Sequence, residues 1–243
     1  MSANGIGAAT KRREDFRFLK GLGKYTDDMN ERGQVHCYIL RSQVAHATIK
    51  GIDTSAAEAA PGVVKVLTAA DFSQYGGIPC GWQVTDRHGE AMKEPKHPIL
   101  AEGKVRHVGD PVAAVLAESL NEAKAAAELI ELDLDELPAV VEMPGAIAGA
   151  GGIHDEAPDN MCFDWEFGDK AATDAAFESA AHVTTLDLRN NRLVPNALEP
   201  RAAIGIYDLA RDEHTLVTTS QNPHVIRLLM GAFVLSIPEH KLR

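Results

Sequence analysis

Six consecutive apolar residues at positions 112–117 constrain the fold of this 243-residue chain more than any other stretch. The run contains no polar residue, whereas a half-exposed strand would alternate apolar with polar side chains, so it predicts a β-strand buried on both faces. A helix is expected directly after it. Ser119 and Glu122 have the spacing of a capping box, and apolar side chains recur at helical spacing from residue 120 to residue 130.

Other elements are expected around this strand–helix unit in the first half of the chain. They are strands at 35–40, 62–67 and 140–141 and a helical turn at 54–60 that Asp53 is placed to cap. Residues 73–103 contain repeated glycine and proline and therefore predict a long irregular loop.

The second half of the chain predicts an antiparallel sheet covered by a helix. Its expected elements are a short helix at 174–181, a half-exposed strand at 182–188, strands at 203–209 and 215–219 joined by a turn at 211–213, and a final helix from Pro223 that Pro238 ends. Strands and helices thus fall into two blocks. This pattern predicts an α+β fold with a boundary near residues 143–158.

Charge and cysteine content exclude several classes of function. Thirty-five acidic and 24 basic residues give a net charge of −11, which argues against binding to a nucleic-acid backbone. The cysteines, Cys37, Cys80 and Cys162, show no paired spacing that would indicate an iron–sulfur cluster, a zinc knuckle or a disulfide framework. The basic residues 11–13 are followed by acidic ones where an export signal would need an apolar run, so a reducing cytoplasm is expected.

Several short patterns are better explained by ordinary structural roles than by nucleotide or metal binding. Gly5-Ile6-Gly7 and Gly21-Leu22-Gly23 lack the third glycine and the strand–helix context of a dinucleotide-binding loop. The ten histidines include no pair at metal-binding helical spacing. The acidic run at 131–136 follows the expected helix and predicts solvated carboxylates rather than a cation site.

Two candidate site features remain, both in the last quarter of the chain. Gln221 lies in the expected turn between a strand and a helix, where free N–H groups of the helix commonly face a ligand. The alternative is an amide that bonds to the nearby backbone. Glu199 and Arg201 flank a proline, and they either belong to the same site or form a structural ion pair with each other.

The order and spacing of many short motifs are shared with one enzyme family. These motifs are Arg13-Glu14-Asp15, Arg17-Phe18-Leu19, Tyr25-Thr26-Asp27-Asp28, Arg41-Ser42, Ala45-His46-Ala47, Pro61-Gly62-Val63, Val108-Gly109-Asp110-Pro111-Val112-Ala113, Gly168-Asp169, Ala175-Ala176-Phe177, Ala181-His182-Val183, Glu199-Pro200-Arg201, Ser220-Gln221 and Pro223-His224. In these motifs the chain resembles the large, molybdopterin-binding subunit of the molybdenum hydroxylases, which include carbon monoxide dehydrogenase, xanthine dehydrogenase and aldehyde oxidase. The resemblance covers nearly the whole chain apart from residues 73–103.

This resemblance implies a division of the chain into four parts. They are an N-terminal arm at 1–19, an α/β hammerhead domain at 20–142, a linker at 143–170, and the truncated first part of a molybdopterin-binding domain at 171–243. The resemblance also implies a cofactor-binding role for Gln221, because the matching glutamine of the family donates a hydrogen bond to an oxygen ligand of molybdenum. A neutral amide suits this task, since it offers a donor beside an anionic cofactor without titrating.

The chemistry of the family implies partners for this chain. Family members hydroxylate substrates with oxygen derived from water and pass electrons to iron–sulfur and FAD partner subunits. They continue past the segment matching Ile237–Arg243 into a glycine-rich loop and, later, the active-site glutamate. The resemblance therefore implies an N-terminal portion that is inactive alone and is completed by the remainder of the large subunit or by a C-terminal partner chain.

The substrate and one alternative function stay open at this point. Carbon monoxide, purines, aldehydes and N-heterocycles are all compatible with the resemblance. The alternative is a non-catalytic assembly or docking module for the redox partner subunits, since apolar surface next to a missing domain favours association. A small-molecule site within the lone chain is disfavoured, because a single glutamine offers few converging polar groups.

Overall fold

The computed structural model of the protein describes residues 5, 7, 9, 11–149 and 151–243. Ile6 of the first glycine motif, the other undescribed residues of the predicted N-terminal arm and residue 150 of the predicted linker lie outside this description. The helices are α1 (Asp15–Leu19), α2 (Ser55–Glu58), α3 (Leu120–Ala127), α4 (Met143–Ile147), α5 (Lys170–Ser179) and α6 (Pro223–Leu228). The strands are β1 (His36–Arg41), β2 (Ala47–Asp53), β3 (Val63–Leu67), β4 (Lys104–Val105), β5 (Pro111–Ala117), β6 (Glu131–Glu136), β7 (Ala203–Asp208) and β8 (Glu213–Thr218).

Strand β5 and helix α3 form the centre of the first half of the chain, as the apolar run predicts. β5 lies between β1 and β3 and pairs antiparallel with both. Ala113, Val115 and Ala117 on one of its faces belong to the same buried cluster as α3, while Val112 joins a second cluster around β2 and β4. The N-cap role of Ser119 is confirmed, because its Oγ accepts a hydrogen bond from the Glu122 backbone N–H at 3.2 Å. The reciprocal bond of a capping box differs from the prediction, because the Glu122 carboxylate accepts from the Ser119 hydroxyl at 2.7 Å and not from the Ser119 backbone N–H.

Alanines let α3 pack closely on this sheet, and this packing predicts a stability effect. Ala123 is fully buried in the cluster with β5. We expect Ala123→Leu to lower the free energy of unfolding by about 1–3 kcal/mol, because added methylenes overpack a filled core. Ala125 lies on the exposed face of the same helix, so Ala125→Leu should change stability by less than about 0.5 kcal/mol. Urea unfolding followed by circular dichroism checks both values, and equal effects at the two positions would contradict this packing.

A second sheet, of strand order β4–β2–β6, consists of three strands that the sequence patterns did not predict. β2 was missed because its register shifts between Ile49 and Gly51, which interrupts the alternation of apolar and polar residues. The acidic run at 131–136, which we expected at a helix end, is strand β6. Its acidic side chains are exposed, as predicted, whereas Leu132 and Leu134 turn toward the core.

The rest of the first half fits the sequence patterns except at Asp53, since Thr54 and not Asp53 is the N-cap residue of α2, and at residues 140–141. Hydrogen bonds from Ser55 to Asp53 precede α2 and lower the pKa of the Asp53 carboxyl. Residues 73–103 contain no helix or strand. The strand expected at 140–141 is wrong, because these residues are outside regular structure and α4 follows them within the predicted linker.

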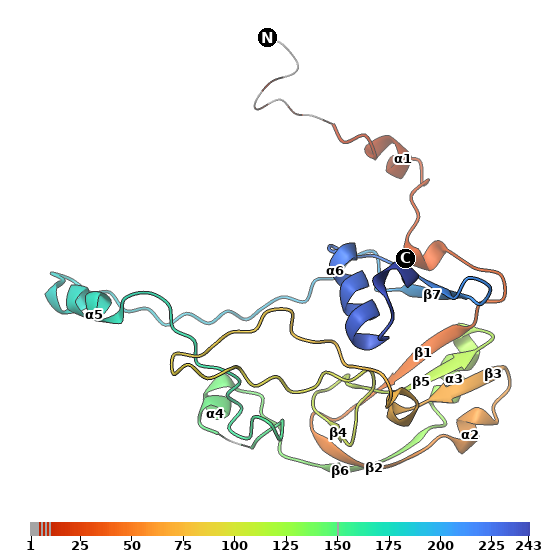
Figure 1. Ribbon diagram of the computed structural model, residues 1–243, viewed down its shortest axis with the longest axis horizontal. Coiled ribbons are helices and arrows are strands. Elements are labelled where there is room, and N and C mark those ends of the chain that lie inside the picture. Colours follow the sequence, from red (N-terminus) through yellow and green to blue (C-terminus); the bar gives the residue numbers. More distant parts are fainter. Residues whose placement is uncertain (1–4, 6, 8, 10, 150) are drawn as a thin grey trace.

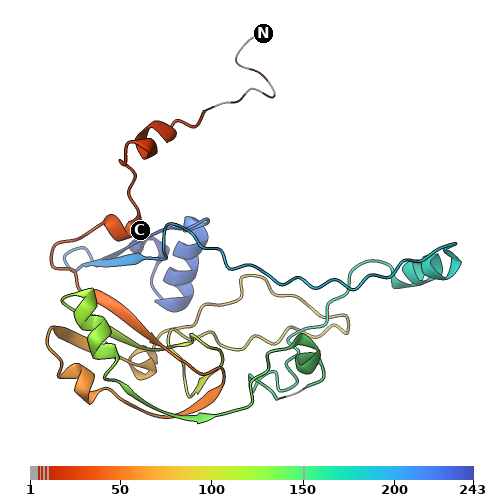
Figure 2. The ribbon, with the colours of Figure 1, turned by 180° about the vertical axis from the view of Figure 1, so that it is seen from behind.

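The last part of the chain is an antiparallel hairpin covered by a helix, as predicted. β7 pairs with β8 in register from Ala203–Thr218 to Asp208–Glu213. α6 begins at Pro223 and continues as a π-helix over Leu229–Val234. Leu242 then forms a parallel bridge with His214 of β8, which adds the end of the chain to the hairpin edge. Figures 1 and 2 show this unit lying beside the sheet that contains β1 and β5.

An exposed extended segment connects α5 to β7. The half-exposed strand expected at 182–188 is wrong, because these residues have no strand partner among the described residues and are all exposed. An alternating pattern alone cannot supply the neighbouring strand that a β-strand needs for its backbone hydrogen bonds. α5 buries none of its side chains and lies at the far end of this segment, well away from the sheets (Figure 1).

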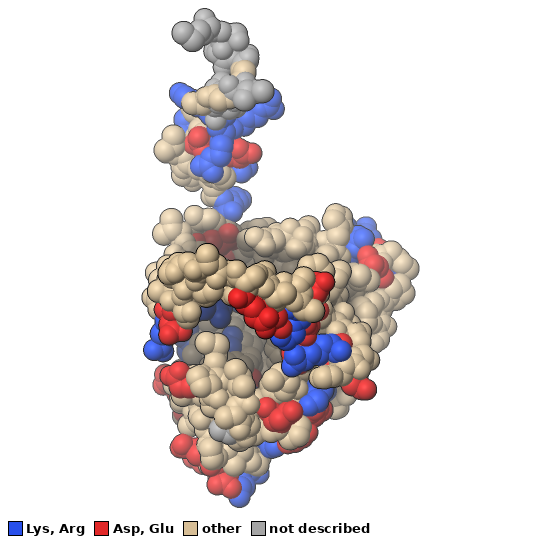
Figure 3. All heavy atoms as spheres, turned by 90° about the vertical axis from the view of Figure 1, so that its left-hand side faces the viewer, with Lys and Arg blue, Asp and Glu red and all other residues tan. Residues whose placement is uncertain are grey.

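Charged side chains are distributed without a single dominant sign on the face seen in Figure 3. Blue Lys and Arg and red Asp and Glu are interspersed there, and the segment that contains α1 projects from the body of the molecule. None of the helices within the described ranges has the length and apolar character needed to span a lipid bilayer.

Candidate functional site

The turn between β8 and α6 carries Gln221 at the position that the sequence predicts. β8 ends at Thr218 and α6 begins at Pro223. Thr218 Oγ1 donates a hydrogen bond to the Ala202 carbonyl oxygen at 3.0 Å, and Ser220 Oγ accepts one from the Asn222 backbone N–H at 3.0 Å. Both bonds fix the backbone of the turn on either side of Gln221.

A hollow of about 400 Å³, with several polar residues in its lining, opens beside this turn. It is lined by Glu199, Pro200, Arg201, Ala202, Thr218, Thr219, Ser220 and Gln221. Gln221 is exposed, and its side chain makes no hydrogen bond to any residue in the described ranges. The alternative of an amide tied to the nearby backbone is therefore not realised, and both ends of the amide stay free to bind a ligand.

Glu199 and Arg201 do not form the ion pair that was the alternative to a site role. No salt bridge joins them in the described part of the chain, and Arg201 is exposed. Instead, Glu199 Oε1 accepts hydrogen bonds from Thr219 Oγ1 at 2.7 Å and from the Thr26 backbone N–H at 3.3 Å. Glu199 Oε1 thus has two hydrogen-bond donors and does not need the Arg201 guanidinium as a partner. Arg201 lines the hollow instead.

Thr26 and Thr219 are site neighbours that sequence reasoning missed. Thr26 is only 7% exposed, and its Oγ1 lies 3.5 Å from Thr219 Oγ1. Thr26 belongs to a short 3-10 helix, Thr26–Asp28, that precedes β1. It is 173 residues from Glu199 in sequence, and no local pattern indicates a contact over that separation.

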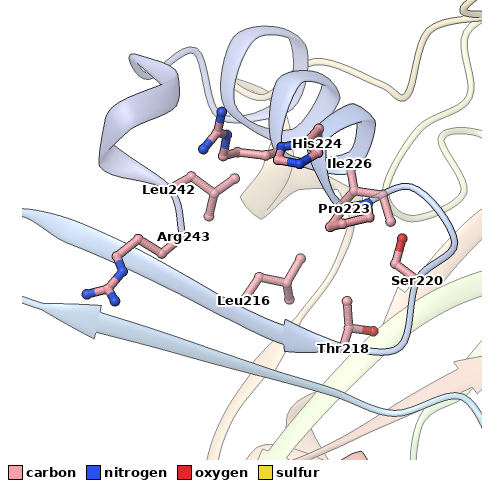
Figure 4. A pocket seen from close by; sticks show the side chains of 9 residues that line it. Leu216, Thr218, Ser220, Pro223, His224, Ile226, Leu242 and Arg243 are labelled. Carbon is pink, nitrogen blue, oxygen red and sulfur yellow. The ribbon is translucent and has the colours of Figure 1, made fainter.

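An apolar pocket of about 210 Å³ lies on the other side of the turn and supports it. Figure 4 shows Leu216 on β8, Ile226 on α6 and Leu242 near the chain end around this pocket, with Thr218 and Ser220 at its edge. The backbone N–H of Leu216 donates to the Arg243 carbonyl oxygen at 2.8 Å, which fixes the end of the chain against β8. Apolar packing behind the turn thus leaves the polar side open toward Gln221.

The far end of the hairpin has its own polar contacts. Tyr207 Oη donates a hydrogen bond to Asp212 Oδ1 at 2.9 Å, and this bond, with the nearby Lys241 ammonium, lowers the pKa of the Asp212 carboxyl. These groups do not line the hollow beside Gln221. They therefore lie on the same hairpin as the candidate site but outside it.

The chemistry of the hollow fits an anionic organic cofactor better than a bare metal ion. Gln221 and Ser220 offer uncharged donors, and Arg201 adds a cation. The Glu199 carboxylate also lines the hollow, but its Oε1 already accepts hydrogen bonds from Thr26 and Thr219. No group of three or more His, Cys, Asp or Glu side chains is arranged to hold a metal ion in the described ranges. The residues present therefore suit contacts to the organic part or the ligands of a cofactor, and they fit a molybdopterin group in this sense.

Two family models match the chain on either side of the predicted boundary. The model described as the aldehyde oxidase and xanthine dehydrogenase a/b hammerhead domain matches residues 20–138. The model described as the molybdopterin cofactor-binding domain matches residues 153–243, which include the whole turn that carries Gln221.

Individual relatives match over almost the full length of this chain. The nicotine 6-hydroxylase large subunit of Paenarthrobacter nicotinovorans is 38% identical, and the match covers 96% of this chain and 28% of the relative. The carbon monoxide dehydrogenase large chain of Afipia carboxidovorans is 35% identical, with 98% of this chain and 30% of the relative covered. The chain thus spans less than a third of the length of these relatives.

A solved structure has the same fold. The crystal structure of quinoline 2-oxidoreductase from Pseudomonas putida 86 superposes with a TM-score of 0.82 at 32% identity, over 96% of this chain and 29% of that chain. Fold, motif order and family matches therefore agree. The chain belongs to the molybdenum hydroxylase large-subunit family, and it contains the α/β hammerhead domain followed by the start of the molybdopterin cofactor-binding domain.

Proposed function

We propose that this chain supplies one wall of a molybdopterin site in an oxidoreductase and that Gln221 is its cofactor-binding residue. The observation that carries this proposal is the unpaired amide of Gln221 beside a hollow of about 400 Å³, within the segment that matches the molybdopterin cofactor-binding domain. The first 19 residues act as an arm, residues 20–142 as the hammerhead domain, residues 143–170 as a linker and residues 171–243 as the first part of the cofactor domain.

The role of Gln221 is to bind and orient the cofactor. Its amide N–H groups donate hydrogen bonds at any physiological pH, because an amide does not titrate in that range. The turn holds this donor on a backbone that is already fixed by Thr218 and Ser220, so little reorganisation is needed on binding. When bound, the molybdenum cofactor supplies the oxygen-transfer and electron-transfer chemistry that no side chain provides.

A further polypeptide completes the site in this proposal. The relatives extend well beyond the part that this chain matches. Large apolar side chains are exposed between the hammerhead domain and β7, namely Phe167, Phe177, Leu188, Leu193, Val194 and Leu198. Exposed apolar surface of this extent is typical of an interaction surface, so we assign residues 165–198 as the docking surface for the remainder of the large subunit or a C-terminal partner chain.

Electron transfer then requires redox partners. The relatives are named as large subunits or chains, which supports assembly with other subunits. We assign an iron–sulfur subunit and an FAD subunit as these partners, with the complex in the cytoplasm. In this arrangement the isolated chain is inactive. The same exposed apolar surface also favours the alternative, a non-catalytic docking module that binds the redox subunits without retaining molybdenum.

Co-expression tests the proposal. The chain would be produced with the iron–sulfur and FAD subunits of a relative and with the part of the Afipia carboxidovorans large chain that it does not match. We expect a complex that reduces an electron-acceptor dye with carbon monoxide, nicotine or quinoline, the compounds named for the relatives. A complex without molybdenum would support the docking module instead, and failure of every chain to co-purify would contradict both functions.

A matched pair of variants tests the docking surface. Leu193→Asp with Val194→Asp should abolish co-purification of the large-chain remainder, because two buried, unpaired carboxylates oppose association. Val141 and Met143 are also exposed but lie outside residues 165–198. Val141→Asp with Met143→Asp should therefore leave co-purification unchanged, and equal losses from both pairs would contradict the assignment.

A further inference from the structure

The carboxylate of Glu199 joins two segments that are distant in sequence. Its Oε1 accepts from Thr219 Oγ1 at 2.7 Å in the turn after β8 and from the Thr26 backbone N–H at 3.3 Å ahead of β1. The two threonine hydroxyls lie 3.5 Å apart. Glu199 therefore bridges the segment before the hammerhead sheets and the turn that carries Gln221.

The segment around Thr26 provides a fixed anchor for this bridge. The Tyr25 backbone N–H donates to Asp28 Oδ2 at 2.8 Å, which closes a capping box around the short 3-10 helix. Thr26 itself is buried against the C-terminal unit. The Glu199 carboxylate accepts a hydrogen bond from the backbone N–H of this buried residue and is thereby fixed in position. It can therefore restrain Thr219, its other hydrogen-bond partner.

The restrained group lies two residues before Gln221. A hydrogen bond to a carboxylate is shorter and stronger than one between neutral groups, and the 2.7 Å bond from Thr219 is of this kind. Ser220 and Thr218 fix the backbone on both sides of Thr219, but neither reaches the segment at Thr26. Glu199 thus joins this turn to a part of the molecule outside the C-terminal unit through two hydrogen bonds, and the longer 3.5 Å contact between the Thr219 and Thr26 hydroxyls lies beside it.

We propose that Glu199 is a positioning residue that fixes the turn at 218–222, and with it the Gln221 amide, against the segment at Thr26. The functional meaning of this role rests on the proposed function of Gln221, but the restraint itself does not. If Glu199 only stabilised the fold, its removal would loosen the whole hairpin. If it is a positioning residue, its removal loosens only the turn at 218–222.

Order parameters of the backbone amides, measured by ¹⁵N relaxation on the full chain, distinguish these roles. We expect the wild-type amides at 219–222 to have values of about 0.85, typical of a rigid backbone. Thr219→Val removes the donor to Glu199 together with the 3.5 Å contact to the Thr26 hydroxyl, whereas Glu199→Ala removes the acceptor and leaves that contact in place. Each variant should lower the values at 220–221 toward about 0.6, the range of flexible backbone.

Conservative variants and a matched control complete the experiment. Thr219→Ser and Glu199→Gln keep a donor and an acceptor at the same places, so they should retain the wild-type values. Tyr207→Phe removes an exposed hydrogen bond at the other end of the hairpin and should leave 219–222 unchanged. Unchanged values in Thr219→Val, or equal loosening in Tyr207→Phe, would overturn the proposal. If Glu199→Ala does not fold, the comparison of Thr219→Val with Thr219→Ser decides.

The order parameters and the turnover measurements together distinguish the positioning role of Glu199 from the cofactor-binding role of Gln221. Loosening of the turn in Thr219→Val, together with full turnover in an assembled Gln221→Ala enzyme, would support the positioning role and contradict the proposed function. A rigid turn in Thr219→Val, together with loss of turnover in Gln221→Ala, would do the reverse.

Discussion

Replacing Gln221 by alanine in the assembled enzyme is expected to lower turnover by about 10²–10³-fold, the effect typical of losing one preorganised donor at a reacting centre. The turn keeps its own hydrogen bonds in this variant, because they come from Thr218 and Ser220. Association of the chains should therefore be unchanged. Dye-reduction rates, normalised to the molybdenum content of each preparation, measure the effect.

Asn222 offers a matched control for this substitution. It carries the same functional group one residue further on, and its side chain makes no capping bond to α6. Asn222→Ala should retain turnover close to that of the wild type, whereas Gln221→Ala should not. Equal turnover in Gln221→Ala and in the wild type would contradict the role assigned to Gln221.

Replacing Gly76 by alanine should produce the largest loss of stability. A Cβ at this position would overlap the backbone carbonyl oxygen of Phe233, which cannot move as the end of a side chain can. The Gly76 N–H also donates to the Val234 carbonyl oxygen at 3.2 Å, so the clash would break a contact between the irregular loop and the π-helix. We expect a loss of about 3 kcal/mol, the combined effect of overpacking and a lost hydrogen bond.

Gly81 is the matched control in the same loop. No atom lies within 4 Å of a Cβ built there, and its backbone does not adopt a positive φ. Gly81→Ala should be neutral or slightly stabilising, because it only reduces the freedom of the unfolded chain. Urea unfolding and limited proteolysis of residues 73–103 compare the two. Similar stability of Gly76→Ala and Gly81→Ala would show that the loop does not dock on the π-helix.

The parts of the fold that could be predicted from the sequence are those that depend on neighbouring residues. The strand at 112–117 and the N-cap at Ser119 each depend on adjacent residues, and both are present in the structure. The hairpin of β7 and β8 was predicted for the same reason, since a short turn joins its strands. The placement of Gln221 followed from these elements, because it lies between the last strand and the helix that begins at Pro223.

Contacts between distant segments explain what could not be predicted. β2 depends on β4 and β6 for its partners, and its shift between Ile49 and Gly51 removes the local alternation that would have indicated a strand. The segment at 182–188 has the alternation but no partner strand in the described ranges. An ion pair with Arg201 was one of the two alternatives for Glu199, whereas its hydrogen-bond donors come from the turn at Thr219 and from Thr26, which is distant in sequence.

Molybdenum analysis of three purified samples tests most directly whether this chain forms one wall of a molybdopterin site. The samples are the chain alone, the large-chain remainder of a relative alone, and the two co-expressed in cells that make the cofactor. We expect a near-stoichiometric amount of molybdenum only in the co-expressed pair, because the residues around Gln221 make up one side of the site. Equal molybdenum content in the remainder with and without this chain would contradict the assignment.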